Sequence, residues 1–177
     1  MSKRILMVIA PDQFRDEELQ VPRDIFKAEG WQVDTVSTQT GKANGMLGAV
    51  EDVQLTLDDI VAANYDAALV VGGMGSVEHL WPNAQLHDAL KTVAGKNKVV
   101  GAICLSGAVL ANAGLLQGKK ATVWEMPESL EALKAGGANY TGEPCTVDGN
   151  VITANGPDAA EAFGKSVAER VKALAAV

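Results

Sequence analysis

The stretch Val99-Val100-Gly101-Ala102-Ile103-Cys104-Leu105-Ser106-Gly107 decides the fold of this 177-residue chain. Its first five residues are apolar without polar alternation, which is typical of a strand buried on both faces of a sheet. Residues 5–9 and 67–71 show the same pattern. Strands of this kind belong to α/β proteins, in which helices cover both faces of a mostly parallel sheet.

Segments with helical spacing of their apolar residues alternate with these strands. A turn signal, Asp148-Gly149, also predicts a two-residue hairpin between two late strands. The alternation predicts one domain over residues 1–177, a doubly wound α/β fold whose ligand site lies beyond the carboxyl ends of the strands. Helices are expected near residues 16–30, 57–63 (capped by Thr56), 83–94, 106–113, 127–134 and from about 158, with further strands at 31–37 and 121–124 and a hairpin at 41–54.

The composition excludes several classes of function. Fifteen Lys and Arg residues against 22 Asp and Glu give a net charge of −7, which argues against a nucleic-acid surface. No segment approaches the roughly 20 apolar residues that cross a bilayer, and no signal peptide is recognisable, so a cytoplasmic protein without membrane contact is expected. Two cysteines and two histidines leave little material for a disulfide framework or a metal site. We therefore expect no metal and no cofactor.

Cys104 is the first candidate for chemistry because it ends a buried strand and begins a helix. A sharp turn there would hold the sulfur at the edge of the sheet, and the amide groups of the following helix would favour the thiolate and receive an oxyanion. The alternative is a small buried thiol that only packs between strand and helix.

Two other segments follow strand ends. Glu18 lies in the first turn of the helix expected near residue 16, from which a protonated carboxyl could reach a thiolate. Asp16 and Glu17 are interpreted as solvent-facing partners of the helix dipole. The pair Gly72-Gly73 follows the strand at 67–71, where free backbone N–H groups could bind an anionic centre.

Taken together in this order, these motifs resemble the ThiJ/PfpI superfamily. The likeness also includes Pro22, the segments 114–122 and 148–157, and so covers nearly the whole chain. The resemblance implies a flavodoxin-like α/β sandwich, a homodimer or higher homo-oligomer, and Cys104 as the nucleophile. It further implies that protonated Glu18 bonds the sulfur and that the amides of Gly73 and Leu105 form the oxyanion hole.

The sequence departs from the family at the usual base. In the peptidase branch a histidine follows the cysteine, and here that residue is Leu105. In the deglycase branch a histidine follows a later strand, and the matching residue here is Trp124, which would narrow the Cys104 pocket. Glu78 and His79 remain as tentative catalytic residues, with an ordinary structural role as the alternative.

The remaining candidates are assigned structural positions: His87 is expected at the surface, and Cys145 as an inert strand thiol. The prediction for function is a cysteine-dependent enzyme acting on a small carbonyl compound, its protein adduct, or an amide or peptide bond. Peptide hydrolysis is less favoured because a leaving amine needs a proton donor. The alternative is a non-enzymatic, redox-responsive stress protein that senses oxidation through Cys104.

Overall fold

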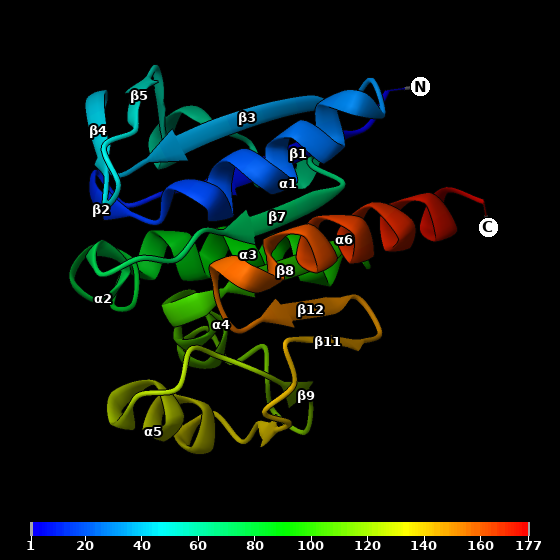
Figure 1. Ribbon diagram of the computed structural model, residues 1–177. Coiled ribbons are helices and arrows are strands. Elements are labelled where there is room, and N and C mark those ends of the chain that lie inside the picture. Colours follow the sequence, from blue (N-terminus) through cyan, green and yellow to red (C-terminus); the bar gives the residue numbers. More distant parts are fainter. Residues whose placement is uncertain (1, 177) are drawn as a thin grey trace.

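The protein is described by a computed structural model that covers residues 2–176. A seven-stranded sheet runs through the molecule in the order β11-β12-β8-β7-β1-β3-β6, and β11 alone pairs antiparallel. Figure 1 shows these strands with helices on either side of them. The predicted doubly wound, flavodoxin-like α/β fold is therefore confirmed.

The elements follow the predicted alternation. The strands are β1 (Arg4–Val8), β2 (Asp12–Phe14), β3 (Gln32–Ser37), β4 (Gly41–Gly45), β5 (Val50–Val53), β6 (Leu55–Thr56), β7 (Ala67–Val70), β8 (Val99–Ile103), β9 (Lys120–Ala121), β10 (Asn139–Tyr140), β11 (Cys145–Asp148) and β12 (Val151–Ala154). The α-helices are α1 (Asp16–Ala28), α2 (Gly75–His79), α3 (Ala84–Gly95), α4 (Gly107–Asn112), α5 (Pro127–Ala135) and α6 (Ala160–Ala175). Single 3-10 turns are η1 (Leu57–Asp59), η2 (Ala62–Asn64), η3 (Cys104–Ser106) and η4 (Pro157–Ala159).

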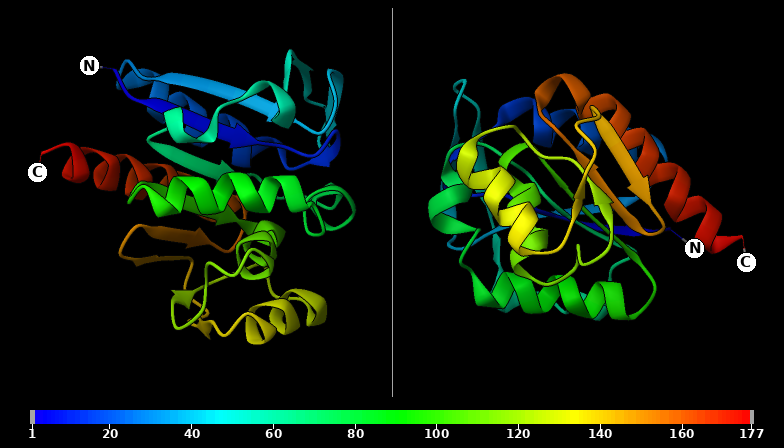
Figure 2. Two further views of the ribbon diagram at one scale, coloured as in Figure 1. Left: turned by 180° about the vertical axis from the view of Figure 1, so that it is seen from behind. Right: turned by 90° about the horizontal axis from the view of Figure 1, so that it is seen from below.

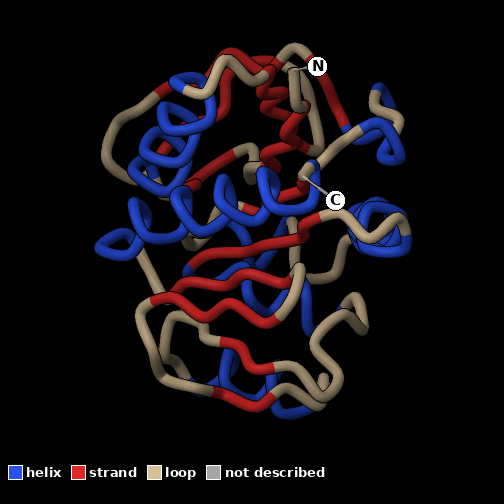
Figure 3. The backbone as a smooth tube through the Cα atoms, turned by 90° about the vertical axis from the view of Figure 1, so that its right-hand side faces the viewer, coloured by secondary structure: helices blue, strands red, loops and turns tan. Residues whose placement is uncertain are grey.

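The two faces of the sheet have separate cores, because successive side chains of a strand point to opposite faces. In β1, Ile5 and Met7 join the core beneath α1 and α6, whereas Leu6 and Val8 join the core beneath α3, α4 and α5. Figure 2 shows α3 lying across the face opposite α1 and α6. In Figure 3 the strands form the inner layer with helices around them. Both faces are thus apolar, which explains the uninterrupted apolar runs.

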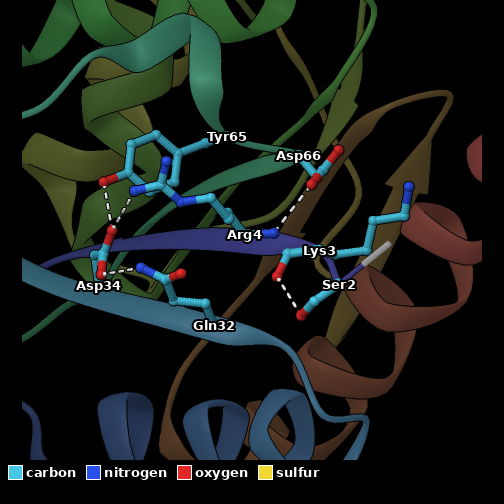
Figure 4. Close-up of polar contacts among 7 residues, drawn as sticks. All are labelled: Ser2, Lys3, Arg4, Gln32, Asp34, Tyr65 and Asp66. Carbon is cyan, nitrogen blue, oxygen red and sulfur yellow. Dashed lines mark hydrogen bonds and ion pairs between the residues drawn. The ribbon is translucent and has the colours of Figure 1, made fainter.

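A cluster of polar side chains lies at the amino ends of the strands of the central sheet (Figure 4). The Asp34 carboxylate accepts hydrogen bonds from Tyr65 Oη at 2.7 Å, Arg4 Nη2 at 3.1 Å and Gln32 Nε2 at 3.2 Å. The Arg4 guanidinium also lies 4.9 Å from the centroid of the Tyr65 ring. Because ligands of this fold bind at the carboxyl ends of the strands, the cluster is a structural feature at the opposite edge.

Some boundaries differ from the sequence prediction. The segment 57–63 forms two 3-10 turns rather than one helix, although Thr56 does cap the first. The strand expected at 121–124 is only β9, which pairs with β10 outside the central sheet. The late hairpin turns at Gly149-Asn150, one residue beyond the predicted pair, because Asp148 still pairs with Val151. Strand β2 was not predicted.

Candidate active site

Cys104 stands at a strained turn between β8 and η3. Its φ is +61°, in the left-handed region that a non-glycine residue rarely adopts. A backbone of this kind costs about 1–3 kcal/mol and persists only where surrounding contacts enforce it. The predicted sharp strand-to-helix turn is therefore present, and it places the thiol beyond the carboxyl end of a central strand.

Three hydrogen bonds hold the backbone on either side of the sulfur. The backbone N–H of Trp124 donates to the carbonyl oxygen of Cys104 at 3.1 Å. The Trp81 indole Nε1 donates to the carbonyl oxygen of Leu105 at 2.8 Å. The Ser106 hydroxyl donates to the carbonyl oxygen of Val71 at 2.6 Å, which ties the elbow to the neighbouring strand end. These three hydrogen bonds hold Cys104 in its strained conformation.

Glu18 lies fully buried in the first turns of α1, beside the sulfur of Cys104. Its Oε1 accepts a hydrogen bond from the Gly72 N–H at 3.0 Å, whereas Oε2 has no hydrogen-bond partner among residues 2–176. Burial raises the pKa of Glu18 to about 8, against the opposing effects of Cys104 and the Gly72 N–H. The carboxyl is therefore mainly protonated at neutral pH, as the sequence analysis expected.

The glycine pair allows the acid and the thiol to approach each other. A Cβ on Gly72 would lie 2.5 Å from Glu18 Oε1 and 2.6 Å from Cys104 Cβ, so no other residue fits there without displacement. Gly73 has a φ of +108°, which favours glycine. The N–H groups of Gly73 and Leu105 both act on the sulfur and lower the pKa of Cys104. These are the two residues to which the resemblance assigns an oxyanion hole, and that role stays a prediction.

Burial dominates the ionisation of Cys104. Burial, followed by the negative charge that Glu18 can carry, raises the pKa of the thiol to about 12. The two N–H groups oppose this shift but do not outweigh it. The backbone N–H groups therefore favour the thiolate, the direction that the sequence predicts, but burial keeps Cys104 protonated in the resting site. Only 7% of Cys104 is exposed, and desolvation of the anion is the dominant effect.

A pocket of about 330 Å³ opens over the sulfur. Its wall is mostly apolar, and Trp124, which is 48% exposed, forms part of it as predicted. This volume suits a small molecule. The lining residues are Arg15, Met46, Gly73, Met74, Cys104, Leu105, Trp124, Pro157 and Asp158.

Asp16 has a role that differs from the expected one. It is buried rather than solvent-facing, and its carboxylate accepts hydrogen bonds from the N–H groups of Leu47 and Ala49 at 3.1 and 2.9 Å. These bonds fix the turn between β4 and β5, which supplies Met46 to the pocket. Glu17 pairs instead with Arg15, 2.9 Å from its Nε.

The structure does not bring Glu78 and His79 to the pocket. Both lie in α2, where His79 Nε2 is 3.7 Å from an exposed Glu78 carboxylate, and neither is among the lining residues. Cys145 is half-buried and its sulfur lies 3.8 Å from the Ser166 hydroxyl. His87 Nε2 donates a hydrogen bond to the carbonyl oxygen of Trp81 at 2.9 Å.

Residues 2–176 contain neither a cluster of metal ligands nor a helix that could cross a membrane. Within this range no three His, Cys, Asp or Glu side chains gather closely enough to hold a metal ion. The helices of the same range are all too short or too polar to span a bilayer.

The fold and the site define a class: a doubly wound α/β protein with a cysteine at a nucleophile elbow and a buried carboxylic acid beside it. The DJ-1/PfpI family profile matches residues 3–170, and the chain belongs to this family. A structure titled as a ThiJ/PfpI domain protein from Brachyspira murdochii is similar, with a TM-score of 0.91, 29% identity, and coverage of 97% of this chain and 98% of that chain.

Two curated relatives extend the comparison. The uncharacterized protein MJ0967 of Methanocaldococcus jannaschii is 50% identical over 169 residues, which is 96% of this chain and 82% of the relative. Protein/nucleic acid deglycase 2 of Escherichia coli is 30% identical over 167 residues, which is 93% of this chain and 95% of the relative. The name of the second relative states a deglycase activity, whereas the name of the first states none.

Sequence reasoning missed the residues that support the elbow. Ser76 and Ser106 are fully buried, with their hydroxyl oxygens 2.7 Å apart, and Trp81 bonds the backbone of Leu105. Ser106 could have been recognised from the sequence, because it places a hydroxyl two residues after the nucleophile, in a segment where apolar side chains are otherwise expected to pack. Trp81 carried no such signal, because its partner lies 24 residues away in the chain.

Proposed function

We propose that the protein is a cysteine-dependent enzyme that acts on a small carbonyl compound. The observation that carries this proposal is the arrangement around Cys104: a nucleophile, two N–H groups on its sulfur and a buried acid that can hold one proton. An addition to a carbonyl needs these three groups and no more.

The reaction begins as the Cys104 thiol passes its proton to the Glu18 carboxylate while the sulfur approaches the carbonyl carbon. The sulfur attacks the carbonyl carbon, the carbon–oxygen π bond breaks, and the oxygen takes the negative charge near the N–H groups of Gly73 and Leu105. Protonated Glu18 then gives its proton to this oxygen, which yields a neutral hemithioacetal. Glu18 thus carries one proton from sulfur to oxygen, and it suits this role because it is protonated and deprotonated near neutral pH.

With a 2-oxoaldehyde the same groups complete a turnover. Glu18 carboxylate removes the hydrogen on the former aldehyde carbon and returns it to the neighbouring carbon. The hydroxyl proton passes from the former aldehyde oxygen to the former ketone oxygen, and the hemithioacetal becomes a 2-hydroxyacyl thioester. Water hydrolyses the thioester and restores the thiol, so the sum is the addition of one water to give a 2-hydroxy acid. The relative named as a deglycase supports chemistry of this carbonyl class.

Peptide hydrolysis and redox sensing are less well supported. The nine residues that line the pocket include no histidine to protonate a leaving amine. Reaction with peroxide requires the thiolate, and burial raises the pKa of Cys104 well above its ordinary value. The arrangement therefore favours addition to a carbonyl, in which proton transfer and bond formation can be coupled.

The test is a substrate panel of methylglyoxal, an amide and a peptide, assayed with the wild type and three variants. Cys104→Ser and Glu18→Gln are expected to abolish methylglyoxal turnover, whereas Cys145→Ser retains it and controls for the loss of a thiol. The wild-type rate is expected to rise with pH toward a midpoint near 8, where Glu18 becomes a carboxylate. Turnover that survives Cys104→Ser, or turnover of the peptide alone, would refute the proposal.

A further inference from the structure

Arg15 is the one cationic side chain among the nine residues that line the Cys104 pocket. It lies directly before α1, and its backbone N–H donates to the carbonyl oxygen of Gly72 at 2.9 Å, which ties it to the glycine turn of the site. Its side chain is 29% exposed, so the charge is partly shielded from water. The reaction proposed above uses neither this charge nor its position.

The guanidinium of Arg15 has hydrogen-bond donors that are free to bind a ligand. Nε is used by Glu17 Oε2 at 2.9 Å, while Nη1 and Nη2 make no hydrogen bond to residues 2–176. A guanidinium edge with two parallel N–H groups matches the two oxygens of a carboxylate, and such charge-assisted pairs are the stronger hydrogen bonds in proteins.

Glu17 pairs with Nε, and the other negative groups nearby leave the two Nη atoms of Arg15 available. Glu18 is mainly neutral at pH 7, because burial raises its pKa to about 8. Asp158 is the other charged residue of the lining, but it is exposed and no ion pair joins it to Arg15. An exposed carboxylate is screened by water and salt, so its repulsion of an anionic ligand is weaker than the attraction by the more buried cation.

We propose that Arg15 binds a carboxylate of the substrate and thereby places the reacting carbonyl at Cys104. The substrate class is a small 2-oxoaldehyde whose carbon chain ends in a carboxylate. This inference rests on the proposed function and gives it a specificity: the acid is preferred over a neutral compound of the same length. The remaining apolar wall, with Met74 and Trp124, suits the hydrocarbon part of such a chain.

The experiment compares 4,5-dioxopentanoate with its methyl ester, which keeps the two carbonyls and removes the charge. In the wild type we expect kcat/KM to be about 10- to 100-fold higher for the acid, as a charge-assisted hydrogen bond would give. Arg15→Gln is expected to abolish this preference through a higher KM for the acid, with the ester unchanged within about twofold. Arg15→Lys should restore part of the preference.

Asp158→Asn is the matched control, because it removes the other charge of the lining. It is expected to keep or modestly increase the preference for the acid. Equal kcat/KM for acid and ester in the wild type, or an equal loss for both substrates in Arg15→Gln, would overturn the inference.

Binding separates this inference from the proposed function. The ligand 4-oxopentanoate has the carboxylate but lacks the aldehyde, so its affinity by isothermal titration calorimetry does not depend on turnover. A loss of at least tenfold in Arg15→Gln supports the carboxylate site even if no substrate is turned over. Affinity that is the same in wild type and Arg15→Gln would overturn it even if methylglyoxal is turned over.

Discussion

Replacement of Glu18 by glutamine is expected to stabilise the fold by an amount that grows with pH. The pKa of this carboxyl is about 8 in the folded protein, whereas in the unfolded chain it has its ordinary value of 4.5. Below pH 4.5 both states hold the proton. Between 4.5 and 8 the unfolded chain loses it while the folded protein keeps it, so the native state binds more protons and its stability falls as pH rises.

The magnitude follows from about 1.36 kcal/mol for each pH unit between these two values. Relative to pH 4, the wild type loses about 3 kcal/mol at pH 7 and about 5 kcal/mol above pH 8 through Glu18 alone. Glutamine has the same shape, its Oε1 can still accept from Gly72, and it does not titrate. The Glu18→Gln variant therefore gains this amount over the wild type at each pH.

The assay is urea unfolding of the wild type and the variant at pH 4, 5.5, 7 and 8, below the range in which the Cys104 thiol titrates. Glu17→Gln is the matched control, because Glu17 is adjacent but partly exposed in an ion pair with Arg15. Its effect on the free energy of unfolding should stay below about 1 kcal/mol at every pH. A stability difference for Glu18→Gln that is flat from pH 4 to 8, or largest at pH 4, would refute the reasoning.

Three further predictions concern the backbone around the site. Ser106→Ala is expected to cost about 1–3 kcal/mol in urea unfolding, because the carbonyl of Val71 loses its buried donor; a cost below 0.5 kcal/mol would contradict this. Cys104→Gly is expected to be about 1 kcal/mol more stable than Cys104→Ala in thermal unfolding, since glycine relieves the strain at φ +61°; the reverse order would exclude strain as the cause. Asp16→Ala is expected to lower the free energy of unfolding by about 1–3 kcal/mol and to speed proteolysis at the β4–β5 turn, because the N–H groups of Leu47 and Ala49 lose their acceptors. An unchanged cleavage rate would show that the turn does not depend on these hydrogen bonds.

The sequence allowed most of the fold to be predicted, because the evidence for it is local. The apolar runs that became β1, β7 and β8 could be recognised without knowing their neighbours, and their order follows from rules of chain connection. The short pieces β2 and β9 were missed or misplaced, since two- or three-residue strands exist only through pairing with a distant partner.

The site was predictable where a residue type and a strand end coincide. Cys104, Glu18 and Gly73 all follow or face the ends of central strands, so topology alone brings them together. The burial of Asp16 was not predictable in this way, because its partners Leu47 and Ala49 lie in a turn about 30 residues away. The high pKa of the thiol was not predictable for a related reason: desolvation depends on how deeply the surrounding residues bury the sulfur, which the local sequence does not show.

The high pKa of Cys104 is itself part of the proposed chemistry. With the thiol pKa raised to about 12 and the carboxyl pKa raised to about 8, transfer of the proton from sulfur to Glu18 is uphill in the resting site. The resting enzyme therefore holds the thiol rather than the thiolate. The sulfur loses its proton only as a carbonyl accepts the electron pair. At that point the N–H groups of Gly73 and Leu105 can stabilise the new oxyanion instead of the sulfur. Such coupling keeps a reactive cysteine largely in its unreactive form toward peroxide. It also explains why a fold would retain a buried acid that costs several kcal/mol above neutral pH: Glu18 is the acid beside the sulfur that can receive the thiol proton.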